Sequence, residues 1–154
     1  MSQETLNLIS AFSGIATSLM LFATIITVWV AISQMKKQSK LTKAANHIEL
    51  RNMFTAENRF TVHANLRPGG VWCDTGVGPK TSFDWLIVED YLGLFENCEK
   101  MLEDNVLDSE LFRRSYLYRL KNIVYNDQIM NDKINNINED WILFKSLMKR
   151  YGLN

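Results

Sequence analysis

The feature that most limits how this chain can fold is an uncharged stretch near its N-terminus. No ionisable side chain occurs between Glu4 and Lys36, and residues 9–32 read ISAFSGIATSLMLFATIITVWVAI without a proline. A helix of these 24 residues is about 36 Å long, and the hydrocarbon core of a bilayer is roughly 30 Å thick. We therefore predict a transmembrane anchor over residues 1–35. A cleavable signal peptide would carry positive charge before the apolar run, and a buried helix of a soluble protein is the remaining alternative.

Positive charge flanks this run on its C-terminal side only. The N-terminal side offers the α-amine and Glu4, whereas the other side carries a cluster of lysines. These are Lys36, Lys37, Lys40 and Lys43. The positive-inside rule then predicts a single-pass protein of the inner membrane, with its N-terminus outside and residues 36–154 in the cytoplasm. Cys73 and Cys98 would face a reducing compartment and are predicted to be free thiols.

Small and hydroxylated residues share one face of the predicted anchor, and bulky apolar residues share the other. The small face consists of Ser10, Ser13, Gly14, Thr17, Thr24, Thr27 and Ala31. Small residues allow helix backbones to approach closely, so this face is predicted to mediate self-association or to line a pore in a homo-oligomer. Alternatively, the hydroxyls bond to carbonyls of their own helix and have no further role.

The rest of the chain predicts an all-α fold, in which the transmembrane helix continues into a small cytoplasmic helical bundle. Neither proline nor glycine occurs from Ala31 to Leu66, so nothing in the composition ends the first helix there. A second helix starts at Ser82, with Thr81 or Ser82 as its cap, and it is acidic. A third helix, capped by Asp108 and Ser109, is basic, and a last amphipathic helix ends near Gly152.

The acidic and basic helices are joined by a short turn, which predicts an antiparallel hairpin. Glu96 and Arg119 each lie among apolar residues of this hairpin. We predict that they form a buried ion pair, which Asn122 could join by hydrogen bonds. A structural pair is favoured over an acid and base couple.

One long loop separates the first helix from the second. Residues 67–82 hold both prolines and four of the seven glycines, without the spacing of a phosphate-binding loop. Trp72 is too large to stay in water without reason, so it is expected to pin this loop to the domain. A loop that recruits a protein partner through Arg67 and Trp72 is the alternative.

Charge and motifs argue against several functions. The 17 basic and 17 acidic residues give zero net charge, so a nucleic-acid partner is not expected. No signature of a known catalytic site is present, and we expect no cofactor and no metal site. Arg59 and His63 come within one residue of the Arg-x-x-x-x-His spacing of HEPN ribonucleases. A solvated helix face is the favoured interpretation of these two residues.

Four segments of the chain carry a resemblance to known sequences. They are RPGG from Arg67 with Trp72, DW at residues 84–85, YLGLFENCEKML from Tyr91, and YRLKNIVYN from Tyr118. These segments resemble an uncharacterised family of small bacterial proteins with one N-terminal membrane helix and a helical cytoplasmic domain. The architecture also resembles the pore-forming membrane accessory protein of Cas13b CRISPR systems, which has a HEPN-like domain.

This second resemblance implies an oligomer that disrupts membranes in phage defence. The alternatives are a membrane-anchored module that recruits a partner and a degenerate HEPN-like domain acting on RNA.

Overall fold

The computed structural model describes the backbone of residues 3–74, 76–136 and 140–153, and the side chains of these residues apart from 4–18. Over this part of the chain every regular element is helical, which confirms the predicted all-α fold. The elements are α1 (Gln3–Thr55), α2 (Glu57–Leu66), α3 (Ser82–Glu103), α4 (Ser109–Ser115), α5 (Leu117–Val124), α6 (Asp127–Ile129), the π-helical turn η1 (Met130–Ile134) and α7 (Ile142–Arg150).

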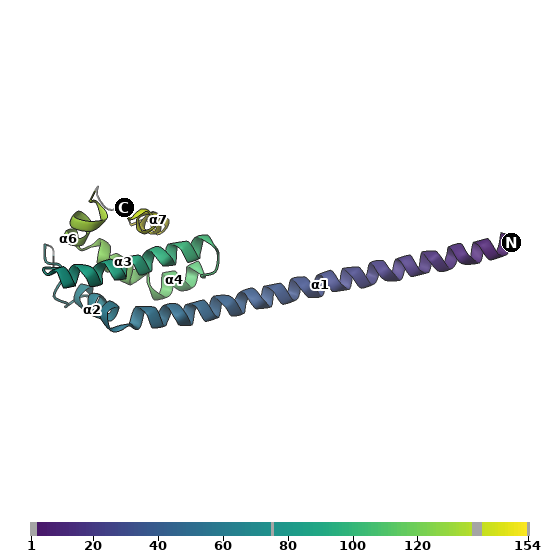
Figure 1. The fold of residues 1–154 in the computed structure, drawn as a ribbon, viewed down its shortest axis with the longest axis horizontal. Coiled ribbons are helices and arrows are strands. Elements are labelled where there is room, and N and C mark those ends of the chain that lie inside the picture. Colours follow the sequence, from purple (N-terminus) through teal and green to yellow (C-terminus); the bar gives the residue numbers. More distant parts are fainter. Residues whose placement is uncertain (1–2, 75, 137–139, 154) are drawn as a thin grey trace. The chain divides into compact units, whose positions relative to one another are not determined.

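The chain divides into two compact units, residues 1–41 and 42–154. We expected a boundary after residue 35, where the apolar run ends, whereas the second unit begins at Thr42. Residues 42–55 of α1 therefore belong to the same unit as α2–α7 (Figure 1).

The first helix continues beyond the apolar run as predicted, but it stops at Thr55 and not at Leu66. Ala56 adopts an extended conformation with φ −57° and ψ 140°, and α2 starts at the next residue. Neither glycine nor proline marks this break, and the carbonyls of Met53 and Phe54 before it accept hydrogen bonds from Arg59 and Arg119.

Phe54, in the last turn of α1, lies at the centre of an aromatic core. Its ring stacks on Tyr116 with centroids 4.5 Å apart and meets Phe95 and Tyr91 edge-on at 5.1 and 5.9 Å. Phe95 in turn contacts Phe144 of α7 at 6.2 Å. Edge-to-face and offset pairs at these distances are favourable beyond the area they bury. The core therefore joins α1, α3, α7 and the segment between α4 and α5.

Helix α3 is the central element, but its partners differ from those predicted. A capping box between Thr81 and Asp84 starts the helix as expected. The main partners of α3 are α7 and α2, not the basic helix that follows it in sequence. The predicted hairpin is therefore not the organising unit of the domain.

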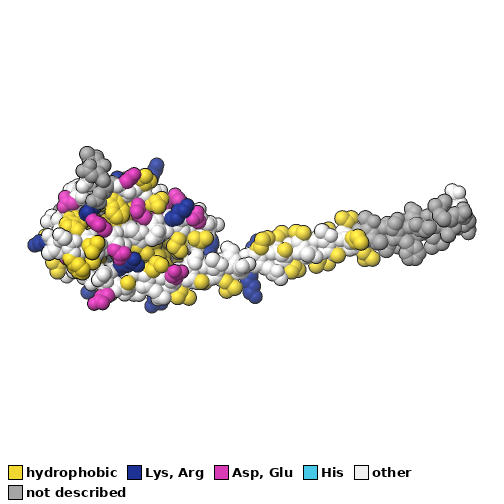
Figure 2. All heavy atoms as spheres, viewed as in Figure 1, with side chains coloured by type: hydrophobic (Ala, Val, Ile, Leu, Met, Phe, Trp, Pro, Cys, Tyr) yellow, Lys and Arg dark blue, Asp and Glu magenta, His cyan; other side chains and the backbone are white. Residues whose placement is uncertain are grey.

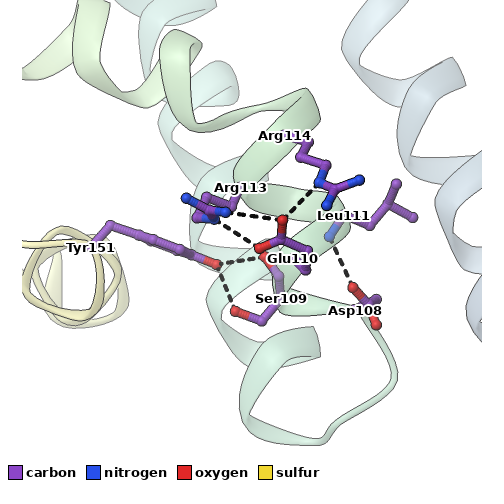
Figure 3. A network of polar contacts seen from close by, with 7 residues as sticks. All are labelled: Asp108, Ser109, Glu110, Leu111, Arg113, Arg114 and Tyr151. Carbon is purple, nitrogen blue, oxygen red and sulfur yellow. Dashed lines mark hydrogen bonds and ion pairs between the residues drawn. The ribbon is translucent and has the colours of Figure 1, made fainter.

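The expected third helix is broken into α4 and α5 at Tyr116, where φ is −130°. Asp108 caps α4 by accepting a hydrogen bond from the Leu111 amide, as predicted (Figure 3). The hydroxyl of Tyr151 lies 3.1 Å from that of Ser109 at the start of α4 (Figure 3). This contact ties the C-terminal end of α7 to α4.

The last helix follows the prediction closely. It ends at Arg150, and Gly152 takes the left-handed conformation with φ +67°. The amides of Gly152 and Leu153 donate to the carbonyls of Lys149 and Met148, which satisfies the helix end. Leu153 is buried and closes the core beside α7.

Candidate functional site

The apolar segment of α1 has no partner within its own chain. All side chains from Leu19 to Leu41 are exposed, and Figure 2 shows apolar side chains along the described part of this helix. By length and composition, α1 can cross a membrane, with a mean hydropathy of 1.6 in its most apolar window. A water-exposed surface of this kind is unfavourable, so a lipid or protein environment would stabilise it.

Two residues of the small face, Thr24 and Thr27, border a shallow depression together with neighbouring apolar residues. Met20, Ala23, Thr24, Thr27 and Val28 surround a shallow depression of ≈ 410 Å³. Residues spaced by three and four along a helix are the positions that form a hole for the side chain of a neighbouring helix.

The threonine hydroxyls on this face are already bonded. Thr24 Oγ1 donates to the Met20 carbonyl and Thr27 Oγ1 to the Ala23 carbonyl, each at 2.8 Å. Ala31 is exposed on the same face. The side chains of the remaining residues predicted for this face lie outside the described ones. They are Ser10, Ser13, Gly14 and Thr17.

The four flanking lysines separate into two groups. Lys36, Lys37 and Lys40 are exposed in the first unit. Lys43 belongs to the second unit, where its ammonium donates to Asn105 Oδ1 at 2.8 Å. Lys43 therefore holds the turn between α3 and α4 against α1.

Arg119 does not pair with Glu96, so the predicted ion pair is wrong. Its Nη1 donates to the Phe54 carbonyl at 3.2 Å and its Nε to the Tyr118 hydroxyl at 2.9 Å. The guanidinium also lies 5.2 Å from the centroid of the Phe54 ring. Glu96 instead accepts a hydrogen bond from the Phe144 amide. Arg119 thus supplies a hydrogen-bond donor to the C-terminus of α1, where the last carbonyls lack partners within the helix.

An ion pair between a buried carboxylate and a partly exposed guanidinium joins α3 to α7. Glu99 is fully buried, and its carboxylate accepts two hydrogen bonds from the Arg150 guanidinium, each of 2.8 Å. Ser146 adds a third bond of 2.8 Å. Glu99 lies one helical turn after Glu96, so its position among buried residues was visible in the sequence, but its partner was not.

Arg59 and His63 are both engaged within the domain. The guanidinium of Arg59 binds Asp90 through two hydrogen bonds of 2.7 and 2.9 Å, which lower the pKa of that carboxyl. His63 is partly buried with its ring edge-on to Tyr118, so the predicted solvated face is wrong for this residue. Burial lowers the pKa of His63 to about 4, and the charges of Arg119 and Arg67 add to this effect.

The glycine-rich loop is pinned to the domain as expected. Trp72 is only 6% exposed, and its carbonyl accepts a hydrogen bond of 2.8 Å from the buried amide of Asn126. The same side-chain amide of Asn126 also donates a hydrogen bond of 2.8 Å to the Val77 carbonyl. Arg67 is exposed at the start of the loop, whereas the Trp72 side chain is buried.

The comparisons with protein families, with curated proteins and with solved structures find no match to this chain.

Proposed function

We propose that this chain is an oligomeric single-pass protein of the inner membrane, with its N-terminus outside and its helical domain in the cytoplasm. The membrane-spanning helices of several copies pack through the small face that includes Thr24, Thr27 and Ala31. Disruption of the membrane by the assembled form, in phage defence, is the activity that we propose for it.

The observation that carries this proposal is the hollow around Ala23, Thr24 and Thr27. Association of helices within lipid depends on close packing, because lipid tails are as apolar as leucine side chains. The depression borders Ala23, Thr24 and Thr27 between the larger Met20 and Val28, and it lets a second helix approach more closely than the bulky face around Phe22 and Trp29 does.

The internal hydrogen bonds of the threonines, which the alternative interpretation also predicts, are compatible with burial of this face. Because Thr24 and Thr27 donate to carbonyls of their own helix, they need no water when the face is covered. The face can therefore be buried against a second copy without leaving an unsatisfied donor. In a ring of helices the same residues lie between neighbours and toward the axis.

The test is the size of the full-length protein in non-ionic detergent, together with leakage of dye from vesicles that contain it. We expect a defined oligomer and leakage, both lost in the double variant Thr24→Leu and Thr27→Leu, which fills the hollow. The matched control is Phe22→Leu with Ile26→Leu on the opposite face, which should change neither.

A monodisperse wild-type monomer would refute the proposal. A wild-type oligomer that causes no leakage would support the proposed self-association but refute membrane disruption. Equal losses in both double variants would show that no specific face mediates the contact.

A further inference from the structure

A small cavity in the helical domain collects positively charged side chains. It measures ≈ 250 Å³ and lies between the last part of α1 and the junction of α4 with α5. Five residues line it, all within the second unit, and none of them is a carboxylate. They are His47, Arg51, Ser115, Tyr116 and Arg119.

The arginines of this cavity differ from most others in the domain. Four of the seven arginines form ion pairs with carboxylates of the domain. These are Arg59, Arg113, Arg114 and Arg150. Among the described residues, Arg51, Arg67 and Arg119 have no carboxylate partner, and two of these three line the same cavity.

The side chains of the cavity retain capacity for a ligand. The Arg51 guanidinium is exposed and makes no hydrogen bond within the described part of the chain. Arg119 uses Nε and Nη1 for Tyr118 and Phe54, but these neutral acceptors leave its charge without a counter-ion. His47 packs edge-on to Tyr116, and its buried Nδ1 has no hydrogen-bond partner among the described residues.

We propose that this cavity binds the phosphate group of a small ligand. Guanidinium groups bind phosphate oxygens through two parallel hydrogen bonds, and the hydroxyl of Ser115 supplies a further donor. The volume of ≈ 250 Å³ lies below the roughly 300–1,000 Å³ of sites for drug-sized molecules, which favours a compact anion. The bound phosphate joins α1 to the α4–α5 junction across two segments that are far apart in sequence.

The experiment is calorimetric titration of the full-length protein in non-ionic detergent with inorganic phosphate, pyrophosphate and adenosine monophosphate, against sodium chloride of equal ionic strength. We expect saturable binding of at least one phosphate compound. Arg51→Gln should weaken it by about tenfold or more, the loss typical of a hydrogen bond between charged groups. Arg51→Lys keeps the charge but loses the planar guanidinium group. Its affinity should therefore lie between those of the wild type and Arg51→Gln.

The matched control is Lys145→Gln, which removes one exposed positive charge outside the cavity and should leave the affinity within about twofold. A second arm distinguishes the sources of the phosphate group. If nanodiscs containing phosphatidic acid suppress the titration and nanodiscs of phosphatidylcholine do not, the ligand is a lipid headgroup. If both retain it, the ligand is soluble.

Absence of binding beyond the chloride control would overturn the proposal. Equal weakening in Arg51→Gln and Lys145→Gln would overturn it as well, because binding would then follow net charge and not the cavity.

Discussion

Glu99 shows how one buried carboxylate connects α3 to α7. Its two oxygens receive three hydrogen bonds, from Arg150 and Ser146, while the arginine itself stays 37% exposed. An ion pair between a buried and a partly exposed group costs less desolvation than a pair that is buried on both sides. The geometry therefore favours a role in fixing α7 on α3.

Removing the partner of Glu99 should destabilise the domain strongly. In Arg150→Ala the carboxylate stays buried without its counter-ion, at a cost of about 3 kcal/mol in the free energy of unfolding. Glu99→Gln should cost less, because the amide oxygen still accepts a hydrogen bond. Lys149→Ala, an exposed neighbour, should stay within about 0.5 kcal/mol of the wild type. Thermal unfolding followed by circular dichroism checks this order, and equal midpoints for Arg150→Ala and Lys149→Ala would contradict it.

His63 makes the stability of the domain depend on pH. Its pKa is about 4 in the folded protein and about 6.5 in an unfolded chain. As the pH falls from 6.5 toward 4, the unfolded state binds a proton that the folded state does not, so the free energy of unfolding decreases.

His63→Gln should lose less stability over this window than the wild type, as measured by unfolding midpoints between pH 7 and 4. The carboxyls with lowered pKa values, such as Asp90, also reduce stability in acid, but they do so in both proteins. Parallel curves for the two proteins would show that His63 does not contribute.

Local and distant interactions differ in how well the sequence predicts them. The caps at Thr81 and Asp108 depend on a side chain and an amide three residues later, so they can be identified without a fold. The partner of Glu99 lies 51 residues away, and its identity depends on which helix packs against α3. The wrong pair, Glu96 with Arg119, came from assuming that consecutive helices pack together.

The C-terminal end of α1 is bound by side chains of two other helices. The last turn of this 53-residue helix has no basic residue of its own. Two guanidinium groups from other helices supply donors instead, Arg59 to the Met53 carbonyl at 3.3 Å and Arg119 to the Phe54 carbonyl at 3.2 Å. Arg59 lies only three residues after Ala56, but Arg119 lies 65 residues from Phe54, so the contact of Arg119 with the end of α1 could not be predicted from the sequence near Ala56.

Arg119→Lys should therefore destabilise the domain although it conserves the charge. A lysine ammonium cannot reproduce the planar fork that reaches both Phe54 and Tyr118, and we expect a loss of about 1–2 kcal/mol. Hydrogen exchange at the amides of residues 50–58 should accelerate more than exchange in α7. Unchanged exchange at the end of α1 would count against this role of Arg119.

The lysines after the apolar run should differ in their effect on membrane orientation. Replacing Lys36, Lys37 and Lys40 by glutamine should weaken the cytoplasmic location of a reporter fused after Asn154. Lys43→Gln should affect orientation less, because it removes a single charge, the one farthest from the apolar run. Robust periplasmic activity of the wild-type fusion would refute the proposed topology.

The buried apolar core of the described residues belongs entirely to the second unit. Every buried apolar side chain of the described chain lies at or beyond Leu50. The fold class and the apolar segment follow from composition and spacing, because both depend on patterns along the chain. The packing partners of α3 depend on contacts across the core and required the structure.

A chain beginning at Thr42 should therefore fold without the anchor. We expect residues 42–154 to give a soluble helical monomer with a cooperative thermal transition, because the core is retained. Gel filtration and circular dichroism are the measurements. An unfolded fragment would show that the first unit contributes to the stability of the domain, and an oligomeric one would place self-association outside the anchor.

The dependence of α3 on α7 has a consequence for biosynthesis. The pair between Glu99 and Arg150 and the burial of Leu153 cannot form until α7 has left the ribosome. The apolar run ends at Ile32 and α7 begins at Ile142, a separation that takes roughly 6–20 s at about 5–20 residues per second. The anchor is therefore available for membrane insertion while the domain is still incomplete. Targeting to the membrane during translation would proceed before a folded domain could obstruct it.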